Sequence, residues 1–248
     1  ELRNPDATVK DAAVRALTSW PNAAALGDAF AVAEQDESDT HKLLALRGAL
    51  RMVALPSDRA KADTIALYEK ALALSTKADE KRAALSGLGD LADAGAIRLV
   101  QPYLADAEVQ AEAKQAMAKL RKALSTYEAS ADAGNAAKAA DNNPDTRWSS
   151  NSPQQGGEWF VVDMIVEATV AKVTLDASGS PGDFPRGYEV YVSNDKANWG
   201  DAVAKGQGDK PVVTIDCAPK AGRYVKIVQT GTAPKNYWSI HELNIETQ

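Results

Sequence analysis

The spacing of apolar residues changes once along this chain, near residue 124, and this change limits the fold more than any other feature. Before it, apolar side chains recur every three or four residues, which is the period of amphipathic helices. After it, they alternate with polar side chains, which is the period of half-buried strands. The chain is therefore predicted to be a multidomain α and β protein, with an α-helical domain at residues 1–123 and a β-rich domain at residues 124–248.

Composition follows the same division. Residues 1–122 are rich in Ala and Leu and carry 17 basic and 18 acidic side chains, whereas residues 123–248 carry 11 and 16 and hold four of the five tryptophans. Neither part is basic, so we expect no sequence-independent binding of nucleic acid. No apolar run is long enough to span a bilayer, so we expect no membrane insertion. The chain begins at Glu1 without a methionine, which favours a processed or trimmed piece of a parent protein.

The helical part contains weak internal similarity. Asn4 before Pro5 predicts the first helix start, and the last helix is expected at residues 107–124. Residues 10–17 resemble residues 81–88, and another helix follows each of them closely. Paired antiparallel helices at a period of roughly 30–40 residues predict a short α-solenoid of the HEAT kind. Such a stack either binds a protein partner on its concave face or serves as a spacer, and we favour the spacer because no exposed aromatic or single-sign stripe stands out.

The second part contains short strand candidates separated by Gly, Pro, Asn and Asp turns. Val173 and Leu175 alternate with Lys172 and Thr174, as expected for a strand buried on one face. The strand candidates are residues 158–163, 170–176, 188–193, 212–216, 223–230 and 243–245. Their spacing predicts an all-β antiparallel sandwich.

Five segments of this part, in the correct order, resemble a known family. They are residues 141–148, 157–163, 185–195, 222–227 and 240–243. The first resembles the Asp-Gly-Asn-x-x-Thr-x-Trp loop of discoidin, or coagulation-factor type C (F5/8 type C), domains, which are similar to family 32 carbohydrate-binding modules. The match covers residues 124–248 almost continuously and implies a galactose-binding-like β-sandwich, or jelly roll.

The loop before Trp148 is a candidate calcium site. Asp141, Asn143 and Thr146 place a carboxylate, an amide and a hydroxyl within six residues of irregular sequence, which is the hard oxygen chemistry that calcium takes. Asn142 stands where the family usually has glycine, and asparagine tolerates a left-handed backbone better than most residues. The alternative is an Asx-rich turn that needs no metal.

The resemblance adds three further ligands to this site. They are the side chain of Glu242 and the main-chain carbonyls of Lys138 and His241. A structural Ca²⁺ held there would clip the two ends of the domain together. The single cysteine, Cys217, cannot form an internal disulfide that would do the same.

The ligand is expected on loops at one end of the sandwich, where an aromatic platform and a few polar groups would bind a sugar. Tyr237 and Trp238 are the candidate platforms, although Trp238 is equally compatible with packing on the metal loop. The candidate polar groups are Asn151, Gln154, Asp176, Asp183 and Arg186. The other three tryptophans of this domain, Trp148, Trp159 and Trp199, are expected to be core or loop-packing residues.

Two points leave the carbohydrate-binding assignment open in detail. Arg186 could simply pair with Asp183 and hold its loop. The galactose-binding members use a His and an Arg at positions where this chain has Glu158 and about Ser178. Glu158 is therefore included among the carbohydrate-binding candidates, and the identity of the sugar is left open.

We therefore expect a non-catalytic carbohydrate-binding module with a helical-repeat spacer, part of a larger extracellular or periplasmic protein that acts on polysaccharides. Its partner would be a glycan or polysaccharide. The alternative is an interaction scaffold in which the helical repeats bind a protein and the sandwich is structural. An exposed aromatic on the helical part would favour the scaffold, and an aromatic-floored loop pocket on the sandwich would favour sugar.

An enzyme is not expected in this chain. Its two histidines, His41 and His241, fall in different domains, and Cys217 has no basic activator nearby in sequence. Glycoside hydrolysis needs two carboxylates at a defined separation, which no sequence pattern here supplies. Lipid binding needs basic or apolar loop tips, and the acidic β domain argues against it.

Overall fold

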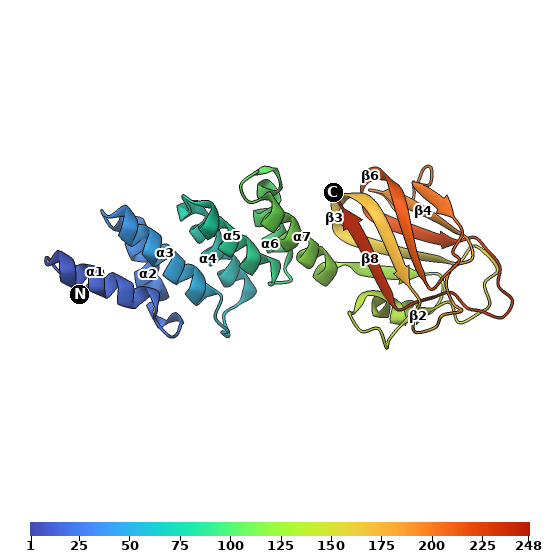
Figure 1. Cartoon of the computed structure of the whole chain (residues 1–248), viewed down its shortest axis with the longest axis horizontal. Coiled ribbons are helices and arrows are strands. Elements are labelled where there is room, and N and C mark those ends of the chain that lie inside the picture. The colour runs from blue at the N-terminus through green and yellow to red at the C-terminus, as the bar shows by residue number, and fades with distance from the viewer. The chain divides into compact units, whose positions relative to one another are not determined.

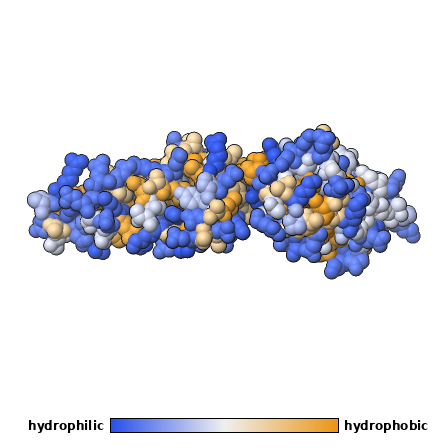
Figure 2. Space-filling view, turned by 90° about the horizontal axis from the view of Figure 1, so that it is seen from above, coloured by the Kyte–Doolittle hydropathy of each residue, from blue (hydrophilic) through white to orange (hydrophobic).

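The computed structural model describes all 248 residues, and the chain divides into two compact units. The helical unit is Glu1–Ala123 and the β unit is Leu124–Gln248. In Figure 2 the visible surface is largely hydrophilic, with apolar patches between the charged residues.

The helical unit contains seven α-helices and two short 3₁₀ helices. Consecutive helices lie side by side within the unit (Figure 1). The α-helices are α1 (Ala7–Thr18), α2 (Leu26–Gln35), α3 (Asp39–Val53), α4 (Lys61–Leu74), α5 (Ala78–Gly89), α6 (Ala94–Val100) and α7 (Gln110–Leu124), and the 3₁₀ helices are η1 (Ala23–Ala25) and η2 (Gln101–Ala105). None of them combines the length and the apolar character needed to cross a bilayer. The helical class of residues 1–123 is confirmed, and the grouping into HEAT-like repeats stays a prediction.

The helix ends differ slightly from expectation. The side chain of Asp6, and not that of Asn4, caps α1 by accepting a hydrogen bond from the Thr8 N–H at 2.8 Å. Asn4 instead accepts one from the main-chain N–H of Asp6 at 2.9 Å, which orders the turn before the cap. The last helix, α7, begins at Gln110 rather than at residue 107.

The β unit contains eight strands and one 3₁₀ helix, η3 (Ala133–Ala140). The strands are β1 (Thr126–Ala129), β2 (Trp148–Ser149), β3 (Trp159–Asp176), β4 (Tyr188–Ser193), β5 (Ala204–Gly206), β6 (Val212–Gln229), β7 (Ser239–Ile240) and β8 (Glu242–Thr247). Five of them are paired in the order β1-β3-β6-β4-β5, while β8 also pairs with β3, and β2 pairs with β7. All of these pairs are antiparallel, as predicted.

Two long strands make the sandwich. β3 and β6 pair along most of their length, with shifts in register between Asp163 and Ala168 and between Val170 and Lys172. Ile165 has a φ of 67°, so the backbone turns sharply at the first shift. Residues from both halves of β3, such as Phe160 and Val173, are fully buried in the same core. The strand therefore folds over, and its two halves lie in opposite layers.

The observed strands differ from those predicted from the sequence. Residues 158–163 and 170–176 were expected to be separate strands and are the two halves of β3; residues 212–216 and 223–230 belong likewise to β6. The chain passes from one layer to the other through the bulge between Asp163 and Ala168, so β3 and β6 remain paired on both sides of it. As a result, both ends of β3 and both ends of β6 lie at the same end of the sandwich.

Candidate binding site

Gln154 is the centre of the loops at that end. Its side chain is only 2% exposed. Its Nε2 donates to the carbonyls of Phe184 at 3.0 Å and Tyr237 at 2.7 Å. Its Oε1 accepts from the main-chain N–H of Arg186 at 3.1 Å and from Nε2 of Gln229 at 2.5 Å. The expectation that Gln154 contacts a ligand is therefore wrong, because these four bonds occupy its amide and burial removes it from solvent.

Two glycines allow the loops to approach. A Cβ on Gly187 would lie 2.6 Å from Oγ1 of Thr230, and a Cβ on Gly231 would lie 2.6 Å from the nitrogen of Gly187. Side chains at these positions would separate loop 177–187 from loop 230–238. The close contact, together with Gln154, makes these loops one connected surface.

Arg186 is held by its own loop. Its guanidinium lies 3.7 Å from the ring centroid of Phe184 and donates to the carbonyls of Phe184 at 2.9 Å and Gly182 at 2.8 Å. The possible pair with Asp183 is absent, since the Asp183 carboxylate accepts from the Ser239 hydroxyl at 2.9 Å. Both predicted ligand groups therefore help to fix the loop in this structure.

Trp238 is not a binding platform. It is fully buried, and its ring packs edge-on against Trp148, with centroids 5.0 Å apart. Trp148 is also fully buried, as expected for a core residue. Tyr237, one residue earlier, is 39% exposed. Neighbouring residues of an extended segment point to opposite sides, so only one of this pair can face solvent.

Asn151 and Tyr237 lie just beyond the β2–β7 ladder. In this ladder Ser149 pairs with Ser239, and the last bond is the 2.8 Å bond from the Ser150 N–H to the Trp238 carbonyl. Asn151 has a φ of 53°, so the chain leaves the extended conformation there. Asn151 and Tyr237 are both exposed, and both remain predicted ligand groups.

The two remaining carboxylates stabilise turns at the same end. Glu158 accepts from the main-chain N–H groups of Gln155 at 2.9 Å and Gly156 at 3.0 Å. Asp176 accepts from the N–H of Ser178 at 2.7 Å. Both side chains are only partly buried, so each retains contact with solvent.

The candidate metal loop is closed by its own side chains. The Asp141 carboxylate accepts from the Asn143 N–H at 3.0 Å and from the Thr146 hydroxyl at 2.7 Å, and that hydroxyl lies 3.0 Å from the Asn143 carbonyl. Asn142 has a φ of 61°, so it adopts the left-handed backbone that its sequence position predicts. The side chains of Asp141 and Thr146 therefore bond to each other, whereas the side-chain oxygen of Asn143 accepts from the Asp145 N–H at 3.1 Å.

The remaining predicted ligands are brought to the same region by the fold. β8, which begins with Glu242, packs against η3, which carries Lys138 and leads directly into the loop. No group of three or more His, Cys, Asp or Glu side chains in the chain is arranged to hold a metal. The donors here are instead two carboxylates with an amide, a hydroxyl and main-chain carbonyls, an all-oxygen set that fits calcium.

His241 joins the metal loop to the binding end. Its Nδ1 lies 2.7 Å from the carbonyl of Pro144, and its Nε2 lies 3.1 Å from the hydroxyl of Ser180. A carbonyl can only accept, so we assign the proton to Nδ1 and the acceptor role to Nε2. Sequence reasoning had considered only the carbonyl of His241, and nothing in the sequence pointed to these side-chain contacts.

The groups that would serve as nucleophile or base are separated. Burial raises the pKa of the Cys217 thiol, with a smaller contribution from the nearby Asp216 carboxylate, which makes the thiolate hard to form. His41 lies in the other unit, with ring nitrogens 3.2 Å from Asp11 and 3.3 Å from Asp36. Cys217 therefore has the character of an inert buried thiol.

The β unit is similar to a known family. Residues 122–243 match the family model described as the F5/8 type C domain. This range covers residues 124–243 of the β unit and the two residues before it.

Two curated galactose oxidases of Gibberella zeae are also similar. Each is 30% identical to this chain over 126 residues, a region that covers 47% of this chain and 18% of the oxidase. The chain therefore spans less than a fifth of the length of these relatives.

Among solved structures, CpGH89CBM32-5 from Clostridium perfringens, in complex with GalNAc-β-1,3-galactose, is 22% identical, with a TM-score of 0.44. The match covers 51% of this chain and 97% of that one. Chitosan-binding module 1 of a chitosanase/glucanase from Paenibacillus sp. IK-5 is 26% identical, with a TM-score of 0.43 and coverage of 49% and 93%.

Proposed function

Because residues 122–243 form an F5/8 type C domain, we propose that the β unit is a non-catalytic carbohydrate-binding module. The observation that carries the proposal is the exposed ring of Tyr237, at an end of the sandwich where Asn151 is also exposed and where the buried side chain of Gln154 joins the loops together. The ring would meet the C–H face of a sugar, and the amide would select its hydroxyls. A single site of this kind is expected to be weak, with a Kd of about 0.1–1 mM.

We further propose that the module acts within a larger extracellular or periplasmic protein that acts on a polysaccharide, with the helical unit as a spacer. The similarity to a fifth or less of each galactose oxidase supports the view that this domain is an appended part. Holding an enzyme near its glycan raises the effective concentration without adding chemistry.

The β unit is also proposed to hold one structural Ca²⁺. Asp141, Asn143, Thr146 and Glu242 would supply side-chain oxygens, and Lys138 and His241 would supply carbonyls. The bound ion would supply a cross-link between the loop and the start of β8. The alternative is that the bonds from Asp141 to Asn143 and Thr146 already close the loop without a metal.

A glycan-array screen of the 248-residue chain in the presence of calcium tests the binding proposal. Wild-type protein should bind one class of glycans, and Tyr237→Ala and Asn151→Ala should each weaken that binding at least about tenfold. Trp20→Ala, which changes an exposed aromatic in the helical unit, is the matched control and should bind as the wild type does. A folded protein that binds no glycan would contradict the proposal.

The scaffold alternative has one observation in its favour. Trp20 is 43% exposed and lines a pocket of about 400 Å³ with Leu2, Leu17 and neighbouring alanines, and the rim carries Glu1 and Asp28. An apolar pocket with an acidic rim would suit an apolar side chain on a basic peptide. A partner that binds the wild type and Tyr237→Ala but not Trp20→Ala would establish this function.

A further inference from the structure

One side of the β unit carries a second group of aromatic side chains. In the sheet register Glu128, Val161, Lys226 and Tyr191 form one row across β1, β3, β6 and β4. Their neighbours along the strands, such as Ile227, are buried in the core, so the row points outward. We call this surface the Lys226 face.

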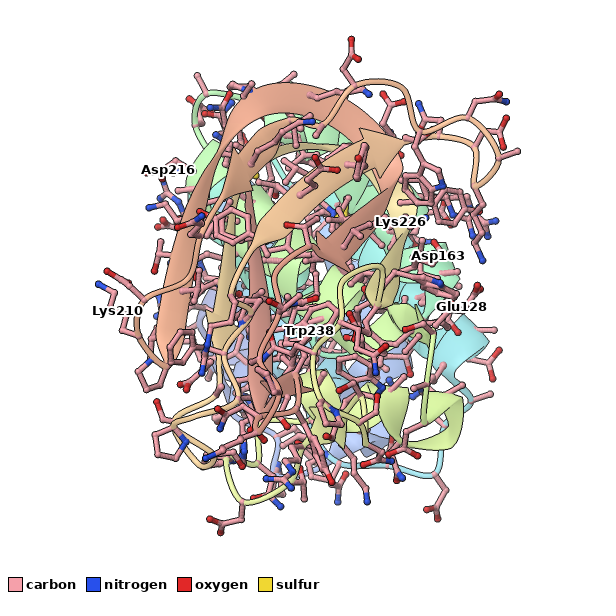
Figure 3. All side chains as sticks on the ribbon, turned by 90° about the vertical axis from the view of Figure 1, so that its right-hand side faces the viewer. Glu128, Asp163, Lys210, Asp216, Lys226 and Trp238 are labelled. Carbon is pink, nitrogen blue, oxygen red and sulfur yellow. The ribbon has the colours of Figure 1, made fainter.

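Figure 3 shows where this surface lies. Lys226, Asp163 and Glu128 lie along one side of the β unit, Asp216 and Lys210 lie on the opposite side, and Trp238 lies between them. The Lys226 face is therefore the outside of one layer of the sandwich.

Two tryptophans from distant parts of the sequence meet at Lys226. Its Nζ lies 5.8 Å from the ring centroid of Trp159 at the start of β3, and 5.5 Å from that of Trp199 in the loop after β4. Both rings remain partly exposed. Val161 points outward in the same row and is only 5% exposed, so the side chains around it form a continuous layer over the strands.

The charges on this face leave Lys226 without a carboxylate partner. Glu128 pairs with Lys196, Asp163 pairs with Arg223 at 2.7 Å, and Glu189 pairs with Lys205 at 2.8 Å. Lys226 forms no ion pair, and its ammonium lies over the two rings. A lysine over exposed rings is held weakly, so its ammonium is available to an incoming anion. This matters in a unit that is acidic as a whole, with 11 basic and 16 acidic side chains from residue 123 onward.

We propose that the Lys226 face is a second glycan-binding surface, specific for a polysaccharide chain that contains uronic acid. The rings of Trp159 and Trp199 would take the C–H faces of successive sugars, and Lys226 between them would pair with one carboxylate. This surface is separate from the proposed site at Tyr237, so an experiment can refute one of the two proposed sites and leave the other standing.

The sparse charge favours a uronic acid chain over nucleic acid. A single-stranded nucleic acid carries one phosphate for each base, and proteins bind it along a strongly basic groove. The other cations of this face are already paired with carboxylates, and the β unit as a whole is acidic. One available ammonium between two rings fits a chain in which carboxylates and sugar faces occur together.

The test is titration of the 248-residue chain with hexagalacturonate, followed by NMR or calorimetry, with a neutral galactohexaose of the same length as the control ligand. The wild type should bind the acidic oligosaccharide more tightly, and the affinity should fall as salt rises. Lys226→Gln, which keeps most of the side-chain stem, should weaken binding by about fivefold to tenfold. Trp199→Ala should weaken it by about tenfold or more.

Two variants identify the surface. Lys210→Gln removes a lysine from the opposite side of the unit and is the matched control, which should leave the affinity for hexagalacturonate unchanged. Tyr237→Ala removes the ring at the binding end and reports whether the oligosaccharide binds there instead. No saturable binding by the folded wild type would overturn the proposal. So would binding that only Tyr237→Ala abolishes, or tighter binding to single-stranded DNA of equal length.

Discussion

The side-chain amide of Gln154 donates to the main-chain carbonyl of Tyr237 at 2.7 Å, so a buried glutamine fixes the residue that the binding end exposes. The same amide bonds to Phe184, in the neighbouring loop. A preorganised surface loses less conformational entropy when a ligand binds. The affinity of this end should therefore depend on a residue that no ligand can touch.

Replacing Gln154 with leucine should destabilise the β unit by about 3 kcal/mol, because the carbonyls of Phe184 and Tyr237 would lose a buried donor. Glycan affinity should fall as well. Urea unfolding followed by tryptophan fluorescence measures the first effect, since four of the five tryptophans lie in the β unit. The control is Gln155→Leu, an exposed neighbour, which should change stability by less than about 0.5 kcal/mol. Equal effects of the two variants would contradict this role for Gln154.

Substitution of Trp238 should lower the stability of the β unit, whereas substitution of Tyr237 should weaken glycan binding. Trp238→Ala removes half of the edge-on pair with Trp148 and should cost about 3–5 kcal/mol of unfolding free energy. Tyr237→Ala should leave the unfolding free energy within about 0.5 kcal/mol of the wild type and weaken glycan binding. Thermal melting and glycan titration of both single variants check this, and a well-folded Trp238→Ala protein that has lost only binding would contradict it.

The period of apolar residues was sufficient to predict the class of each unit, because burial on one side imposes a fixed repeat on a helix or a strand. It did not predict that β3 continues through Ile165, which has a φ of 67° and whose N–H donates to the Asp163 carboxylate at 2.8 Å. As a result, residues 158–163 and 170–176 looked like separate strands.

The binding end was harder to predict than the fold. The sequence placed Asn151 and Tyr237 in loops, and the β2–β7 ladder, which joins residues far apart in the chain, brings these loops together. It could not distinguish Tyr237 from Trp238, since both are aromatic and adjacent. Gln154 looked like a ligand contact because its burial depends on loops that begin at residues 177 and 230.

Removal of calcium should lower the melting temperature of the β unit and leave the helical unit unchanged. A cation bound by the folded loop and not by the unfolded chain stabilises the fold by mass action. Calorimetry with excess calcium and with excess chelator measures the shift, and far-ultraviolet circular dichroism follows the helices.

Two variants show whether that shift comes from the proposed loop. Asp141→Ala should abolish the response to calcium, and Asp209→Ala, an exposed aspartate in another loop, should retain it. Identical melting in calcium and chelator would establish that the Asx-rich loop needs no metal.

Asp163 and Arg223 should make the β unit sensitive to acid. The Arg223 guanidinium donates to both carboxylate oxygens, at 2.7 and 2.8 Å. Partial burial acts to raise the pKa of Asp163, but hydrogen bonds from Arg223 and from the Ile165 N–H, with the charges of Arg223 and Lys196, outweigh it and lower the pKa below its usual range. A lowered pKa in the folded state means that the stabilisation is present above the ordinary aspartate pKa and is lost as the pH falls through the lowered value.

Asp163→Asn should therefore cost about 1–2 kcal/mol near neutral pH, and the difference from the wild type should shrink as the pH falls below about 4. Urea unfolding of the β unit at a series of pH values, followed by tryptophan fluorescence, measures this dependence. Asp216→Asn is the matched control on the opposite side of the unit, since the Asp216 side chain is 86% exposed and lies 3.8 Å from Lys172. That variant should follow the wild-type pH profile. If Asp163→Asn also follows it, the bidentate pair contributes nothing to the acid sensitivity.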